Sequence, residues 1–74
     1  MNEPAWLPLK KMIPEELLDD WMYMGMQGVD IYLYKHRDTR KYLNIDTKGQ
    51  CWMYNANLGI YQPIDALTAL EEIK

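Results

Sequence analysis

The fold is most clearly indicated by residues 32–45, YLYKHRDTRKYLNI. Two runs of alternating residues flank a charged centre in this stretch. Alternation with a period of two is typical of a strand whose two faces differ. The polar residues between the runs indicate a turn. The stretch therefore predicts a β-hairpin with an aliphatic face and a face that carries tyrosines and charge.

The register of this hairpin follows if aliphatic residues lie opposite one another, since paired residues of an antiparallel ladder share a face. The predicted pairs are Ile31–Ile45, Leu33–Leu43 and Tyr34–Tyr42. This register leaves residues 37–39 as the loop. Thr39 is β-branched and disfavours the left-handed conformation that such a loop requires, so a longer or bulged loop is the alternative.

A second hairpin is predicted by residues 46–50, DTKGQ. Gly49 supplies, without steric cost, the left-handed conformation needed at the end of a three-residue loop. Residues 47–49 would form this loop. The predicted pairs are Ile45–Cys51 and Leu43–Met53.

The C-terminal third indicates a short fourth strand over residues 60–63, which Pro63 would end. Ile60 is out of step with the preceding strand, so we expect a bulge there or no strand. Residues 65–74, DALTALEEIK, then predict a short helix with Asp65 as its N-cap. The residues expected to face inward are Leu67, Leu70 and Ile73.

The N-terminal part reads as an arm followed by a helix. Pro4 and Pro8 argue against a regular helix in residues 1–12 and favour an extended arm, whose apolar residues suggest that it docks. Residues 13–28, IPEELLDDWMYMGMQG, predict a helix with Pro14 at its first position. The residues at helical spacing are Leu18, Trp21, Met22 and Gly25.

Together these elements predict a single α+β domain over residues 1–74. It would contain a helix, an antiparallel meander of three or four strands and a short C-terminal helix, with both helices on one face of the sheet. The expected core face consists of Val29, Ile31, Leu33, Leu43, Ile45, Cys51 and Met53.

The opposite face is the candidate site. Its expected residues are Tyr32, Tyr34, Tyr42, Trp52 and Tyr54, with His36 and Arg40 toward the first turn. Tyrosine and tryptophan combine a rigid apolar body with a polar tip, and both are enriched at binding sites. We expect this face to bind another protein or a second copy of the chain. The alternatives are single-stranded nucleic acid stacked on the rings, or aromatic residues that only stabilise the strands.

Charge weighs against nucleic acid. The net charge of the 74 residues is −3, and the basic centre is flanked by acidic segments. Phosphate binding would favour more positive charge.

Catalysis and cofactor binding are not expected. His36 and Cys51 are the one histidine and the one cysteine, and the predicted register places them on opposite faces, which argues against a catalytic pair or a metal site. No glycine loop for phosphate is present. We therefore expect no cofactor, metal or small-molecule substrate.

A cytoplasmic location without membrane association is expected from a single cysteine and from the lack of a long apolar run. The small size alone suggests an accessory protein of a mobile element.

Overall fold

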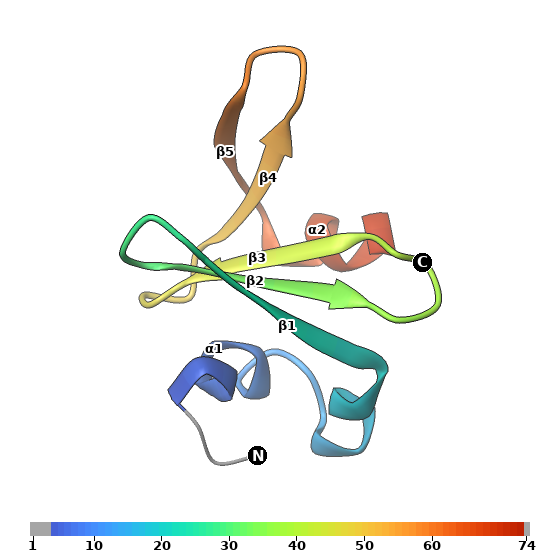
Figure 1. The fold of residues 1–74 in the computed structure, drawn as a ribbon. Coiled ribbons are helices and arrows are strands. Elements are labelled where there is room, and N and C mark those ends of the chain that lie inside the picture. Colours follow the sequence, from blue (N-terminus) through green and yellow to red (C-terminus); the bar gives the residue numbers. More distant parts are fainter. Residues whose placement is uncertain (1–3, 74) are drawn as a thin grey trace.

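The computed structural model describes residues 4–73 and shows an α+β protein with one five-stranded antiparallel sheet in the order β1-β2-β3-β4-β5 (Figure 1). The strands are β1 (Trp21–Gln27), β2 (Ile31–His36), β3 (Tyr42–Asp46), β4 (Cys51–Asn55) and β5 (Ile60–Ile64). The helical segments are η1 (Pro4–Trp6), α1 (Leu7–Lys10), η2 (Glu15–Asp20) and α2 (Ala66–Ile73). The predicted α+β meander with a short C-terminal helix is confirmed, with one strand more than expected.

The extra strand is β1, and the predicted helix over residues 13–28 is wrong for this part. Only the 3-10 helix η2 is helical there, and β1 pairs antiparallel with β2. A register shift between Tyr23 and Gly25 leaves Met24 as an extra residue in β1, and Gly25 has a φ of 107°. Tryptophan, tyrosine and glycine are poor helix formers, so pairing with β2 overrides the helical spacing of the apolar residues.

The described part of the predicted extended arm forms two short helical turns, η1 and α1, while residues 1–3 lie outside the described residues. Pro4 begins η1 and Pro8 lies in the first turn of α1, where the missing N–H removes no helical hydrogen bond. The turns dock as expected: Leu9 is fully buried and Trp6 packs against the core.

The β2–β3 register differs by one residue from the prediction. The observed pairs are Ile31–Asp46, Tyr32–Ile45, Leu33–Asn44, Tyr34–Leu43 and Lys35–Tyr42. The loop contains residues 37–40, because the backbone N–H of His36 donates to the Lys41 carbonyl at 2.9 Å. Arg40 takes the left-handed conformation that Thr39 avoids, with a φ of 65°. The longer loop that the sequence left open is therefore the one that forms.

A slip of one residue exchanges the two faces of β2. Tyr32 and Tyr34 now share the face of Leu43, whereas Ile31 and Leu33 lie on the other face. The expected grouping of aliphatic residues on one face is therefore wrong for β2. Val29, also expected in the core, lies in the β1–β2 turn and is 91% exposed.

The second hairpin is confirmed in its loop and in one of its two predicted pairs. Ile45 pairs with Cys51, and Gly49 has a φ of 89°. The next strand, β5, pairs with β4 over its whole length, without the expected bulge, and it extends through Pro63 to Ile64. Because β5 is an edge strand, the missing N–H of proline is tolerated there.

The C-terminal helix α2 begins as predicted. The Asp65 carboxylate accepts hydrogen bonds from the backbone N–H groups of Leu67 at 3.1 Å and Thr68 at 3.4 Å. Ile73 is buried as expected, but Leu67 is 74% exposed and Ala69 takes the inward position instead.

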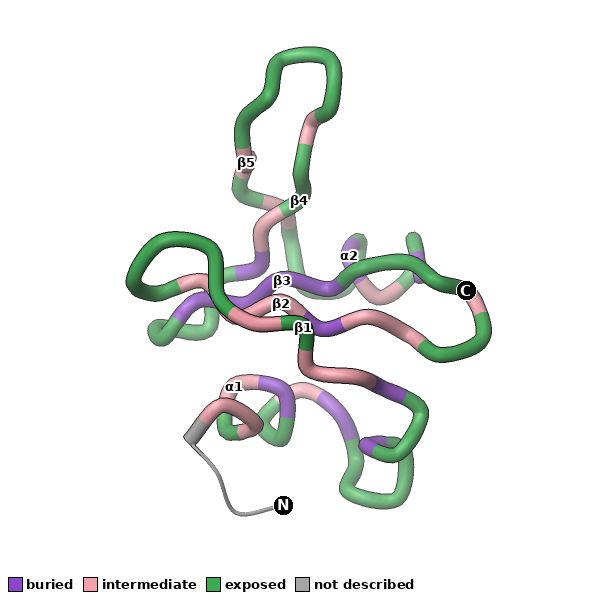
Figure 2. The backbone as a smooth tube through the Cα atoms, in the orientation of Figure 1, coloured by how far each residue is buried: buried purple, intermediate pink, exposed green. Residues whose placement is uncertain are grey.

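One core joins these elements. Its buried members include Leu9 and Leu18 from the N-terminal segment, Ile45 from β3, and Ala69 and Ile73 from α2. Figure 2 shows buried residues along β3 and in the N-terminal turns, whereas most of the β4–β5 hairpin is exposed. The N-terminal turns and α2 therefore stabilise β1–β3 and leave the hairpin largely uncovered.

Candidate binding groove

A fork between β3 and β4 creates a concave surface. The two strands pair at only two positions, Ile45–Cys51 and Asn44–Trp52. The expected third pair, Leu43–Met53, does not form, and the β4–β5 hairpin projects away from β3 (Figure 1). The prediction that Met53 lies in the core is therefore wrong, and its side chain is 46% exposed.

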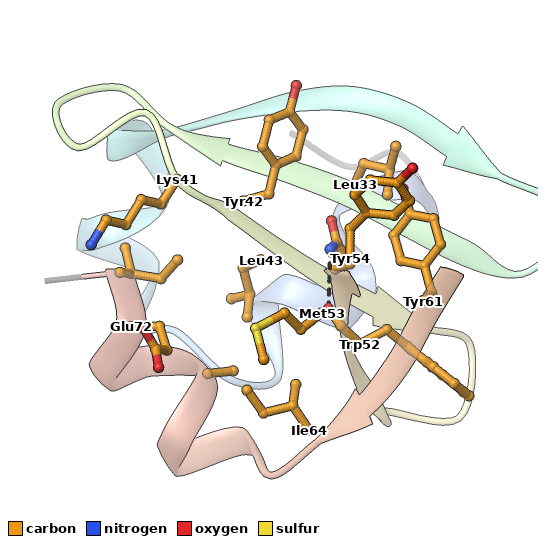
Figure 3. A pocket seen from close by; sticks show the side chains of 13 residues that line it. Leu33, Lys41, Tyr42, Leu43, Trp52, Met53, Tyr54, Tyr61, Ile64 and Glu72 are labelled. Carbon is orange, nitrogen blue, oxygen red and sulfur yellow. Dashed lines mark hydrogen bonds between the residues drawn. The ribbon is translucent and has the colours of Figure 1, made fainter. Parts of the chain in front are cut away.

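The fork holds a groove of about 550 Å³, which α2 closes on one side. Its lining residues are Leu33, Lys41, Tyr42, Leu43, Asn44, Trp52, Met53, Tyr54, Tyr61, Ile64, Ala69, Glu72 and Ile73. Figure 3 shows Lys41 and Glu72 at one end of the groove and the rings of Tyr54 and Tyr61 at the other. We call this surface the fork groove. Its volume lies in the range of ligand pockets, about 300–1,000 Å³.

The walls of the fork groove are aromatic and apolar. The rings of Tyr54 and Tyr61 lie 5.0 Å apart between centroids, inclined at 55°. Tyr42 stands on β3, with the Lys35 ammonium 5.7 Å from the centre of its ring. Tyr42, Met53 and Tyr54 are each about half exposed. The groove thus offers large apolar side chains that the fold itself does not bury.

The apex of the fork, where β3 and β4 last pair, is polar and buried. The side-chain N–H of Asn44 donates to the Trp52 carbonyl at 3.0 Å, the bond drawn dashed in Figure 3. The indole N–H of Trp52 in turn donates to the Asp46 carboxylate at 3.0 Å. Asn44 and Asp46 are only 3% and 6% exposed. These bonds fix the point at which the two strands separate.

Asp46 is ionised at this apex. Burial alone would raise the pKa of its carboxyl group, but hydrogen bonds from the Trp52 indole and from the backbone N–H groups of Gln50 and Lys48 outweigh burial. The pKa therefore lies below its ordinary value of 3.8.

The structure brings three of the predicted site residues together and separates the others. Tyr42, Trp52 and Tyr54 line the fork groove. Tyr32 and Tyr34 lie on the opposite side of the sheet, where Tyr34 is fully buried. The expectation that Tyr34 shares a face with Tyr42 and Tyr54 is wrong, because the slip in β2 turns Tyr34 inward.

Tyr34 is instead a core residue. Its hydroxyl donates to the Ala5 carbonyl at 2.6 Å, and its ring lies 5.8 Å from Trp6 and 5.9 Å from Tyr23 between centroids. Burial raises the pKa of this hydroxyl well above its ordinary value, so Tyr34 remains protonated and donating.

His36 and Arg40 lie at the β2–β3 turn and do not line the fork groove. The imidazole Nδ1 of His36 accepts backbone N–H groups from Asp38 at 3.1 Å and Thr39 at 3.3 Å. The ring packs edge-on against Trp21, with 5.0 Å between the ring centroids. Both residues therefore shape the turn rather than the groove.

Cys51 shares the sheet face of His36, which corrects the expectation of opposite faces. His36 lies opposite Lys41, just before β3, and Cys51 lies opposite Ile45 of β3, so the two are roughly 13 Å apart along the strand direction. Burial raises the pKa of the Cys51 thiol, whose sulfur lies 3.5 Å from that of Met12. Within residues 4–73 no three histidine, cysteine or acidic side chains gather as a metal site would need.

Sequence reasoning missed Tyr61, Met53 and Asn44 as groove residues. Tyr61 lies in the groove because of the β4–β5 register, which places it opposite Tyr54. Met53 lies there because the β3–β4 ladder ends at Trp52. Asn44 carried a signal in the sequence, because it is a polar residue between Leu43 and Ile45.

Comparisons of the chain with protein-family models, with curated proteins and with solved structures each find no match. None of the helices between residues 4 and 73 combines the length and the apolar character needed to cross a membrane.

Proposed function

We propose that this chain is a non-catalytic binding protein whose fork groove takes up part of a partner protein. The observation that carries the proposal is the exposure of large apolar side chains inside a concave surface. Tyr42, Met53 and Tyr54 remain 46–51% exposed within one groove. Contiguous apolar surface of this kind is typical of protein-binding sites, and aromatic residues contribute most of the binding energy there.

The charges of the groove support a protein partner over single-stranded nucleic acid. Lys41 is the one basic residue among the described lining residues, and Glu72 lies at the same end. The Arg37 guanidinium donates to the Asp19 carbonyl at 2.7 Å, at the turn outside the groove. Arg37 and Arg40 of the β2–β3 turn therefore do not line the surface that carries the exposed rings.

Affinity purification with matched variants tests the proposal. The tagged chain is compared with Tyr54→Asp, which places a charge in the groove, and with Val29→Asp, which places it on an exposed turn. We expect the wild type and Val29→Asp to retain the same protein in stoichiometric amount after nuclease treatment, and Tyr54→Asp to lose it. Self-association would appear as dimers in sedimentation that Tyr54→Asp converts to monomers.

Two results would overturn the proposal. If Tyr54→Asp retained the partner as well as Val29→Asp, the groove would not be the binding surface. If the wild type retained only nucleic acid, and nuclease removed all retained material, the partner class would be wrong.

A further inference from the structure

An unpaired hydrogen-bond acceptor lies buried at the apex of the fork groove. The side-chain carbonyl oxygen, Oδ1, of Asn44 exposes less than 1 Å² and accepts no hydrogen bond from the described residues. Its amide nitrogen is already bonded to the Trp52 carbonyl, which fixes the orientation of the carboxamide. A buried acceptor without a donor is unfavourable, and native proteins contain few of them.

We infer that the groove binds a tryptophan side chain of a partner protein, with the indole N–H donating to Asn44 Oδ1. This inference rests on the proposed function and names the chemistry of the partner. The required group combines an apolar body with one donor. Indole has this composition, since it donates through its N–H and has no acceptor that would need a donor in return.

The groove matches such a group in shape and charge. Tyr42, Tyr54 and Tyr61 supply aromatic walls, and aromatic pairs in tilted or offset arrangements are favourable. Lys41 and Glu72 carry opposite charges at one end, so the groove does not favour an ionic ligand. Its volume of about 550 Å³ leaves room for residues that flank the tryptophan.

Access to Asn44 requires a small movement of the groove wall. Because the oxygen is covered, a donor reaches it only after a neighbouring side chain turns aside. Tyr42 and Tyr54 are about half exposed and neither belongs to the buried core, so each can change rotamer without disturbing it. The bound indole would then cover tyrosine surface that faces solvent in the free chain, and its N–H would donate to the buried Asn44 oxygen.

Three small ligands test the contact on the unmodified chain. N-acetyl-L-tryptophanamide and its 5-methyl and 1-methyl derivatives are titrated at millimolar concentration, and backbone amide shifts are followed by NMR. The two derivatives add the same volume, but only the 1-methyl compound loses the N–H donor. We expect the parent and the 5-methyl compound to shift Tyr42, Met53 and Tyr54, and the 1-methyl compound to bind roughly tenfold more weakly.

The outcomes separate this inference from the proposed function. Equal binding of the 1-methyl and 5-methyl compounds would overturn the contact with Asn44, as would shifts confined to residues outside the groove. No binding by any of the three, together with a protein partner that Tyr54→Asp fails to retain, would overturn the tryptophan inference and leave the groove as the protein-binding surface. If neither ligand nor protein bound, both proposals would be wrong.

Discussion

At the scale of single residues, the burial of Tyr34 depends on the register of the β2–β3 ladder. Tyr34 is fully buried, whereas Tyr42 on the neighbouring strand is 46% exposed. The two tyrosines would share a face if the β2–β3 loop were one residue shorter. Burial of a tyrosine also requires a partner for its hydroxyl, which the Ala5 carbonyl provides.

Tyr34→Phe should lower the free energy of unfolding by about 1–2 kcal/mol, because the Ala5 carbonyl loses its donor in a partly buried position. The matched change Tyr42→Phe should have an effect below about 0.5 kcal/mol, since that hydroxyl belongs to an exposed residue. Urea denaturation of both variants measures the difference. Equal effects would place Tyr34 outside the core and contradict the observed register.

Asp46 should make stability depend on pH in the acidic range. Its pKa in the folded chain lies below the ordinary 3.8, so its stabilisation is present above about pH 4 and is lost as the pH falls through the folded value. We expect Asp46→Asn to be less stable at neutral pH and to lose less stability on acidification. Urea midpoints measured between about pH 6 and pH 2 check this. Asp38→Asn, an exposed change in the turn, serves as the control.

The same acid-induced loss in Asp46→Asn and in the wild type would show that the Asp46 carboxylate does not carry this pH dependence.

At the scale of elements, the β2–β3 turn decides which face each tyrosine takes. The imidazole of His36 accepts two backbone N–H groups of the turn, and Arg40 completes it in a left-handed conformation. For a residue other than glycine, asparagine or aspartate this conformation is unfavourable by about 1–2 kcal/mol. The turn therefore maintains the observed register at some cost in stability.

Arg40→Gly should stabilise the protein by about 0.5–1 kcal/mol, because glycine takes the left-handed conformation without steric cost. The greater entropy of glycine in the unfolded chain offsets part of this gain. Lys41→Gly is the neighbouring control and should destabilise, since Lys41 does not have a positive φ and glycine there only adds unfolded-state entropy. Thermal melting of the two variants gives the comparison. Destabilisation by Arg40→Gly would contradict the left-handed turn.

Sequence patterns correctly predicted the elements whose local turn and capping residues favour the same structure as the strand pairing. The second hairpin and the Asp65 cap follow from loop length, from Gly49 and from a favoured capping residue. The predicted helix over residues 13–28 failed because its apolar spacing also fits a strand, and only pairing with β2 distinguishes the two.

The candidate site was predictable in part for a similar reason. Tyr42, Trp52 and Tyr54 were found because they face outward in either register of the first hairpin. Tyr32 and Tyr34 were misplaced by the single extra loop residue. The groove itself was not predictable, because it depends on where the β3–β4 ladder ends, and alternation alone does not mark that position.

At the scale of the whole molecule, the chain divides into a packed part and a projecting hairpin. The N-terminal turns, α2 and β1–β3 supply most of the buried core, whereas most of the β4–β5 hairpin is exposed (Figure 2). Small domains bury a limited fraction of their apolar surface. In this chain, part of the surface left uncovered is gathered into the fork groove, where a partner can bury it.

Site-specific photo-crosslinking tests the role of the fork groove most directly. The chain carries p-benzoylphenylalanine at position 42, inside the groove, or at position 29, on the exposed β1–β2 turn. After irradiation in cells, crosslinked products are identified by mass spectrometry. We expect position 42 to yield one protein crosslink, at a tryptophan-bearing segment or a second copy of the chain, and position 29 to yield none. A crosslink to the same protein from position 29 but not from position 42 would contradict the account.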